Sequence, residues 1–399
     1  MKISLAMPVF DNQFAIAVGM IGLVLMTLAL FTLRQSAFYR GLVDREAASN
    51  RFHAIDGLRG YLALGVLFHH LAVNYQFYQT GEWGNPPPGL STMSGRGAVA
   101  FFFMITALLF WGRVVDSGER FDAIKFYVSR FRRMIPMYVV SVVLVVLTVI
   151  VLTDFHQNVT SKVFFQQVVE WLLFTIPGVP DINGLDKTYL INTVFWSLVF
   201  EWKFYLLLPL MAVFSRGRLQ WLLLVLAGIC IWTLSTLKVE WFFFAGCLAS
   251  NLIRVPRVRN FALSPAGTAL AVISLCATYA FKPWVYDAAG AALLLFPFIA
   301  IASGNSFFGV LTCRPARLLG LLSYSIYVIH NWLIYVVCRL VDPYFHVDTL
   351  SPSAYWLLGG AISVAAVLVS ILTYRFVEYP FIRPSSSQKS NVEAAGAVG

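Results

Sequence analysis

Charged residues are scarce in this chain. Asp, Glu, Lys and Arg make up 12% of its 399 residues, whereas a soluble domain usually has about 25%. Hydrophobic residues make up 59% of the sequence, and the mean hydropathy is +0.75. A soluble protein has no place for so much apolar surface, so the composition excludes the soluble classes and predicts a polytopic membrane protein.

Cysteine is also rare. None of the five cysteines belongs to a CxxC pair, and most lie within apolar runs. We therefore interpret them as packing residues and not as disulfides or ligands. The sequence also has no HxxE-type ligand pair, and the adjacent His69 and His70 point apart on a helix, so we predict no metal site.

Acidic residues are fewer than basic ones, 19 against 29, which gives a net charge of +10. Such an excess can indicate nucleic-acid binding, but basic loops that orient membrane helices explain it, and we expect no nucleic-acid partner. With the N-terminus outside and the spans alternating, 21 of the 29 Lys and Arg residues fall on the inside. This bias predicts an outside N-terminus and an inside C-terminus.

Long apolar runs are abundant. Because backbone groups in lipid must pair within their own segment, each run is predicted to be a helix. The result is an all-α, polytopic transmembrane helix bundle of about 11 spans. The runs lie at 14–33, 61–79, 98–112, 136–153, 193–214, 219–236, 240–253, 263–281, 286–307, 318–338 and 354–377. Two long outside loops, 81–96 and 154–192, are either an acceptor-facing rim or ordinary connections.

Polar residues interrupt one apolar run in a regular pattern. In DGLRGYLALGVLFHH, Arg59 and His70 are eleven residues apart, so a helix places them within about 20° of each other and about 16 Å apart along its axis. Asp56 and Asn74 lie on the same stripe, and His69 points elsewhere. Ionisable groups at such depth usually face a bundle interior or a watery cavity. A neutral imidazole there can act as a general base; a histidine hydrogen-bonded to a neighbouring helix is the alternative.

Two further apolar runs carry polar residues on one helix face. These residues are Ser197, Glu201 and Tyr205 in one run, and Ser323, Tyr327 and His330 in the other. Three such stripes predict a shared polar cavity within the membrane, with hydrogen bonding between helices as the alternative. On the inside, Arg130 and Arg133 are spaced to bind the phosphates of a nucleotide-like donor, whereas topogenic charge suffices for Arg132.

Six ordered motifs resemble those of the acyltransferase-3 family of integral membrane acyltransferases, which includes glycan O-acetylases. They are DGLRGYLALGVLFHH, with its Arg-x10-His signature, FFMITA, SRFRRMIP, FWSLVFEWKFYLLLP, LSYSIYVIH and VEYP. The signature fits Arg59 and His70. Glu201 takes the place of the first Glu of the family's WSLSVEEQFYLLLP segment, whereas Trp202 and Lys203 depart from it.

The resemblance implies transfer of an acyl group, expected to be acetyl, from cytoplasmic acyl-CoA to a hydroxyl of an extracytoplasmic or lipid-linked glycan. Some members acylate small molecules instead. The family core has a cytoplasmic N-terminus, so residues 1–51 are interpreted as an extra transmembrane helix with a basic linker. Residues 52–384 form the acyltransferase domain, and residues 385–399 form a disordered tail. We expect a multi-pass protein of the bacterial inner membrane, in contact with lipid; whether a protein partner takes part is left open.

A mechanism follows from the resemblance as a hypothesis. His70 is the base, Glu201 orients or charges it or positions the acceptor, and Arg59 stabilises charge at the thioester. Arg130, Arg133 and Arg59 hold the acyl-CoA phosphates, and no permanently bound cofactor is expected. The remaining polar residues line the cavity: Asp56, Asn74, Ser197, Tyr205, Ser323, Tyr327 and His330. A covalent acyl-His or acyl-Ser intermediate, the latter at Ser197, is a second route.

Two other functions are compatible with these residues. Intramembrane Arg, His and Glu also build proton-coupled transporters, although the sequence shows no internal repeat. A scaffold in a glycan-assembly complex is the other alternative.

Overall fold

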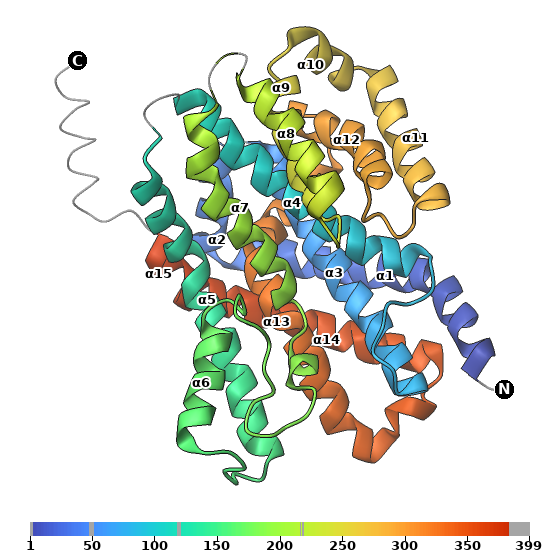
Figure 1. Ribbon diagram of the computed structural model, residues 1–399. Coiled ribbons are helices and arrows are strands. Elements are labelled where there is room, and N and C mark those ends of the chain that lie inside the picture. Colours follow the sequence, from blue (N-terminus) through green and yellow to red (C-terminus); the bar gives the residue numbers. More distant parts are fainter. Residues whose placement is uncertain (1–2, 48–51, 118–120, 216, 218, 383–399) are drawn as a thin grey trace.

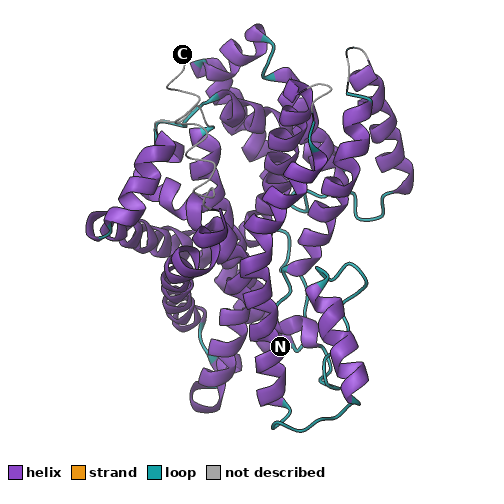
Figure 2. Cartoon of the chain, turned by 90° about the vertical axis from the view of Figure 1, so that its left-hand side faces the viewer, coloured by secondary structure: helices purple, strands orange, loops and turns teal. Residues whose placement is uncertain are grey.

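The computed structural model describes residues 3–47, 52–117, 121–215, 217 and 219–382 (Figure 1). Over these ranges the chain is helical and contains no strand (Figure 2), which confirms the all-α prediction. The predicted disordered tail, 385–399, lies outside the described residues. The helices are α1 (Ile3–Gln35), α2 (Ala37–Ala47), α3 (His53–Thr80), α4 (Leu90–Ser117), α5 (Ala123–Leu152), α6 (Ser161–Leu172), α7 (Phe195–Val213), α8 (Leu219–Leu234), α9 (Glu240–Leu252), α10 (Pro256–Leu263), α11 (Pro265–Phe281), α12 (Ala288–Ser303), α13 (Arg314–Phe345), α14 (Pro352–Thr373) and α15 (Tyr379–Ile382).

Each of the eleven apolar runs coincides with an α-helix. In the described ranges, six helices are long and apolar enough to cross a membrane, and a seventh span arises if α10 and α11, bent by 78°, are counted as one. An integral membrane protein is therefore indicated. The count of eleven crossings and the outside N-terminus stay predictions.

Four helices that the apolar pattern did not predict are α2, α6, α10 and the single turn α15. All are short, and α2 and α10 are too polar to span a membrane. Helix α6 lies in the long loop at 154–192 and begins where the Thr160 side chain accepts a hydrogen bond from the amide of Val163. A search for long apolar runs does not detect such helices, because their stability comes from one apolar face and from capping.

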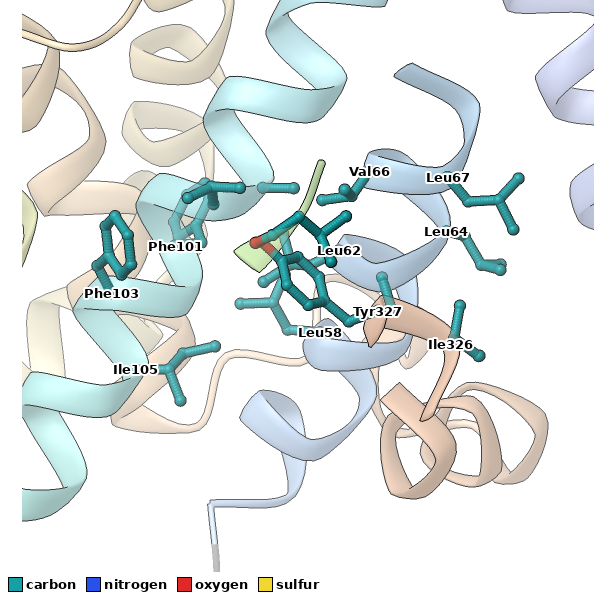
Figure 3. Close-up of a cluster of buried hydrophobic side chains, with 14 of the residues drawn as sticks. Leu58, Leu62, Leu64, Val66, Leu67, Phe101, Phe103, Ile105, Ile326 and Tyr327 are labelled. Atoms are coloured by element: carbon teal, nitrogen blue, oxygen red, sulfur yellow. The ribbon is translucent and has the colours of Figure 1, made fainter. Parts of the chain in front are cut away.

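Helices α3, α4 and α13 form the centre of the bundle (Figure 1). Helix α3 packs against both α4 and α13, and most residues of these three helices are buried. In the close-up of Figure 3, Tyr327 reaches from α13 into the space between α3 and α4, among apolar side chains of those helices. By contrast, α8 exposes large apolar side chains such as Trp221 and Trp232, as expected for a lipid-facing helix.

Glycines bring α3 and α13 into backbone contact. A β-carbon at Gly320 would lie 1.7 Å from the carbonyl oxygen of Asp56, and one at Gly60 would lie 2.8 Å from the amide nitrogen of Gly320. Small residues at such crossings allow close helix packing in membranes. The crossing fixes the two helices against each other and places the side chains one to three turns further along them side by side.

Candidate active site

Three cavities follow one another between the central helices and α7. We call them the basic cavity (650 Å³), the middle cavity (130 Å³) and the aromatic cavity (560 Å³). The basic and middle cavities share Arg59, Arg130 and Glu201 among their lining residues. The middle and aromatic cavities share Val99 and Tyr327, and we call this junction the waist. The three spaces therefore form one series with its narrowest part in the middle.

The basic cavity collects cationic side chains from α3, α4 and α5. Three carboxylates, from Glu46, Asp56 and Glu201, also line it, so the cations are in excess. The cations are Arg59, Arg113, Lys125, Arg130, Arg132 and Arg133. Such a site attracts a polyanion. The structure thus places Arg132, assigned above to topogenic charge, beside Arg130 and Arg133 on the same cavity wall.

The aromatic cavity has a different wall. It is lined by His69, His70, Arg96, Asn192 and Thr193, together with large aromatic side chains. Those aromatic residues are Trp83, Tyr189, Phe195, Trp196, Tyr286 and Tyr327. Both long loops contribute to this wall, so the structure favours a rim over ordinary connections for them.

The imidazoles of His70 and His330 are in direct contact. Nδ1 of His70 lies 2.8 Å from Nε2 of His330, and Nδ1 of His330 lies 2.9 Å from the carbonyl oxygen of Ile326. On the other side, Nε2 of His70 lies 3.5 Å from Oγ1 of Thr193. His330 is completely buried, whereas His70 is partly exposed on the aromatic cavity.

This network assigns the protons of the two rings. A carbonyl oxygen only accepts, so neutral His330 donates from Nδ1 to Ile326 and has its lone pair at Nε2. Neutral His70 must then donate from Nδ1 to that nitrogen. The lone pair of His70 is left at Nε2, which faces Thr193 and the aromatic cavity.

His69 also lines the aromatic cavity, although its position on the helix suggested that it points elsewhere. The two rings are 5.4 Å apart between centroids. Nδ1 of His69 lies 2.9 Å from the carbonyl oxygen of Ser91 on α4, and a β-carbon at Gly95 would lie 2.2 Å from the His69 ring. His69 is therefore held against α4, while His70 is held against α13.

Glu201 lies away from the two histidines. It lines the middle and basic cavities, on the opposite side of the waist from His70. Tyr205, one helical turn further on α7, donates its hydroxyl to Glu201, and Thr106 on α4 donates at 3.3 Å. The orienting partner of His70 in the structure is thus His330, and Glu201 belongs to the other end of the series.

The two arginines of the α5 pair have different environments. Arg130 lies with its guanidinium carbon 4.5 Å from the ring centroid of Phe110 and lines both the basic and the middle cavity. Arg133 forms an ion pair at 3.7 Å with Glu378, which is fully buried and also accepts the hydroxyl of Ser325. Part of the charge of Arg133 is therefore satisfied within the protein.

The other predicted residues divide between the cavities and the packing around them. Ser197 and Ser323 line the middle cavity, and the hydroxyl oxygens of Ser197 and Tyr327 are 2.6 Å apart. Asn74 lines none of the three cavities, because its side chain faces α14 and accepts a hydrogen bond from Tyr355 at 2.9 Å.

Several residues in or beside the cavities were not predicted from the sequence. Arg96 ends one of the predicted long loops, and Thr193 lies two residues before the FWSLVFEWKFYLLLP motif. Glu378, which lies within VEYP, lines none of the three cavities but pairs with Arg133 of the basic cavity. The signal that could have identified these residues is their closeness in sequence to the motifs and loops described above. Their partners come from distant parts of the chain, so sequence spacing did not identify them.

Comparison with known proteins agrees with the motifs. The model of the acyltransferase-3 domain family matches residues 52–375. The chain is 24% identical over 374 residues to "Peptidoglycan O-acetyltransferase OatA" of Listeria monocytogenes and 24% identical over 376 residues to "Putative peptidoglycan O-acetyltransferase YrhL" of Bacillus subtilis. Each match covers 82% of this chain but only 55% and 54% of those proteins, so the chain spans about half the length of these curated relatives.

No solved structure matches the chain significantly. The family match extends over most of the chain and includes every residue that lines the middle and aromatic cavities. The chain belongs to the acyltransferase-3 family of integral membrane acyltransferases.

Proposed function

We propose that this protein is an O-acetyltransferase of the bacterial inner membrane, which moves an acetyl group from cytoplasmic acetyl-CoA to a hydroxyl of a cell-envelope glycan. The observation that carries the proposal is the series of cavities, with excess cations at one end and a free imidazole nitrogen at the other. A donor and an acceptor that enter from opposite ends meet at the waist. Both curated relatives are named for O-acetylation of peptidoglycan.

The basic cavity is proposed to bind the donor. The phosphates of acyl-CoA would bind to Arg130 and Arg133, with Arg59 deeper in the series. The middle cavity, at 130 Å³, is large enough for a thin acyl-thioester and too small for the nucleotide. In this proposal the thioester carbonyl lies near Tyr327 at the waist.

The aromatic cavity is proposed to bind the acceptor. Nε2 of His70 takes the proton of the acceptor hydroxyl as its oxygen attacks the thioester carbonyl carbon. The tetrahedral intermediate then collapses, the carbon–sulfur bond breaks, and the CoA sulfur receives the proton from Nε2. Arg59 lies on the donor side of the waist, where its charge stabilises the developing oxyanion.

His330 is proposed to hold His70 in the reactive tautomer. Without an acceptor at Nδ1, the His70 ring loses the bond that keeps its lone pair at Nε2. Glu201, held by Tyr205 and Thr106, is proposed to position the donor end through its place beside Arg59 and Arg130. This assignment replaces a direct pairing of Glu201 with His70.

Direct transfer is preferred to an acyl-serine intermediate. Ser197 is bonded to the carbonyl oxygen of Val194 at 3.1 Å and to Tyr327, and no histidine contacts it among the described residues. A serine nucleophile requires an adjacent base. Ser197 is therefore assigned to holding Tyr327 at the waist.

The test is acetyl transfer in proteoliposomes that contain the purified full chain, radiolabelled acetyl-CoA and peptidoglycan fragments. Label on a glycan hydroxyl, lost in His70→Ala with donor binding retained, is the expected result. Proton-coupled uptake of a solute without any label on an acceptor would instead establish a transporter. Label that reaches a glycan only when a second envelope protein is added would assign the final transfer to a partner.

A further inference from the structure

The aromatic cavity has one charged side chain in its lining, that of Arg96 on α4. No Asp or Glu lines this cavity, and no ion pair of Arg96 occurs in the described part of the chain. The basic cavity at the other end of the series is lined by three carboxylates as well as by cations, whereas the aromatic cavity has no carboxylate in its lining. A partly buried cation without a neutralising group favours an anionic ligand.

The guanidinium group of Arg96 is fixed before any ligand arrives. Its Nε donates to the carbonyl oxygen of Trp284 at 2.7 Å, and its central carbon lies 4.1 Å from the ring centroid of Tyr286 and 5.0 Å from that of Trp284. These contacts use one of the five N–H donors and orient the plane of the group. The two terminal nitrogens have no hydrogen-bond acceptor among the described residues and form the fork that binds an oxyanion in bidentate fashion.

The rest of the cavity suits a sugar. Aromatic side chains besides Tyr286, which Arg96 covers, line the cavity: Trp83, Tyr189 and Trp196, and aromatic rings suit the C–H groups of a saccharide. The volume of 560 Å³ lies in the range of about 300–1,000 Å³ that is usual for ligand pockets.

We infer that Arg96 is the receptor for an oxyanion on the acceptor, so that the preferred acceptor is an anionic glycan, with a carboxylate or phosphate bound at Arg96 and a hydroxyl at His70. The inference rests on the proposed function and adds a substrate class to it. Binding the anion at a fixed point orients the sugar and thereby selects which hydroxyl reaches Nε2 of His70.

The experiment compares matched acceptors with the full-length protein and acetyl-CoA. One pair is the N-acetylglucosaminyl–N-acetylmuramic acid disaccharide and its methyl ester; the other is chitobiose 1-phosphate and chitobiose. We expect the acid to have a KM roughly 10- to 100-fold below that of its ester, as for a charge-assisted hydrogen-bonded pair. The same difference in the second pair instead of the first would assign the site to phosphate.

Arg96→Gln should remove this preference by raising the KM of the anionic acceptor, with little change for the neutral one. Arg96→Lys keeps the charge without the fork and should restore part of the difference. Arg257→Gln on the exposed α10 is the matched control. Equal KM values within both pairs for the unchanged protein, or equal effects of Arg96→Gln on neutral and anionic acceptors, would overturn the inference.

Calorimetric binding of the same four saccharides without acetyl-CoA separates this inference from the proposed function. Anion-selective binding that depends on Arg96, together with a failure of acetyl transfer to every acceptor, would contradict the proposed function alone. Acetyl transfer without anion selectivity in binding or KM would contradict the Arg96 assignment alone.

Discussion

The basic and aromatic cavities are similar in volume, 650 and 560 Å³, but opposite in chemistry. Helices α3, α4, α7 and α13 contribute side chains to both cavities. Helix α3 contributes Arg59 to the basic side and His70 to the aromatic side, and α4 contributes Arg113 and Arg96 in the same way. One membrane helix therefore contributes to two chemically different environments, because a few turns along its axis separate the basic cavity from the aromatic cavity.

The largest effect on acetyl transfer is expected from a substitution in the aromatic cavity. If His70 is the base, His70→Ala should lower kcat for acetyl transfer by about 10²- to 10⁴-fold, while the KM for acetyl-CoA changes little because the donor binds in the other cavity. Steady-state kinetics with both substrates varied measures this. His69→Gln, in the same cavity but bonded to Ser91, is the matched control and should retain most activity. Equal losses of kcat in His70→Ala and His69→Gln would show that a changed shape of the cavity, and not the removal of a base, lowers the rate.

Loss of the contact between His70 and His330 should have the next largest effect on kcat for acetyl transfer. His330→Leu removes the acceptor for Nδ1 of His70, and the resulting misorientation should cost about 10²-fold in kcat. His330→Gln can again accept a hydrogen bond and should recover part of the loss. If His330 had only a structural role, its replacement would not change which ring nitrogen of His70 carries the proton. ¹⁵N NMR of labelled histidine measures this directly. We expect His70 protonated at Nδ1 in the unchanged protein; protonation at Nε2 would refute the assignment.

A change on the basic side should affect a different kinetic constant. Arg130→Gln should raise the KM for acetyl-CoA by roughly 10- to 100-fold, as expected for loss of a hydrogen bond to a charged group, and leave the KM for the acceptor unchanged. Arg257→Gln again controls for loss of a surface charge. If Arg130→Gln acts on the acceptor KM instead, the assignment of donor and acceptor to the two cavities is reversed.

The smallest effect is expected at the boundary between the cavities. Ser197→Ala removes a hydrogen bond from Tyr327 but no nucleophile, so transfer should fall by less than about tenfold, in line with one neutral hydrogen bond. Acid quenching after incubation with radiolabelled acetyl-CoA alone should leave no label on the protein. Protein-bound label that disappears in Ser197→Ala would establish the covalent route.

The sequence predicted the helices well and their contacts poorly. Apolar runs are local, and each one became a helix, whereas the short helices α2, α6, α10 and α15 were not predicted because they have no long apolar run. Angles around α3 placed Arg59 and His70 on one face of the helix, and in the structure the two residues line different cavities, Arg59 the basic and middle ones and His70 the aromatic one. They did not show that His330 is the neighbour of His70, because that contact depends on where Gly60 and Gly320 let two distant segments cross.

The same limit explains Glu201. A stripe on α7 shows which side chains share a face, and Ser197, Glu201 and Tyr205 do line one cavity. How deep a residue of one helix lies relative to a residue of another helix depends on how the helices pack together, and a pattern within one helix does not show this. The sequence therefore suggested that Glu201 orients His70 or positions the acceptor, whereas the two side chains line different cavities and the hydrogen bonds of Glu201 go to Thr106 and Tyr205.

The waist has an electrical consequence. If the basic and aromatic cavities open to opposite membrane faces, as the proposed function requires, the membrane voltage falls mainly across the waist at Val99 and Tyr327, and a unit charge that crosses the full voltage gains or loses about 2.3 kcal/mol per 100 mV. In the proposed reaction an acyl group leaves outward as a proton returns inward to sulfur, so no net charge crosses. Turnover should then proceed at the same rate in energised and de-energised vesicles, and the cell can modify its envelope without drawing on its ion gradients.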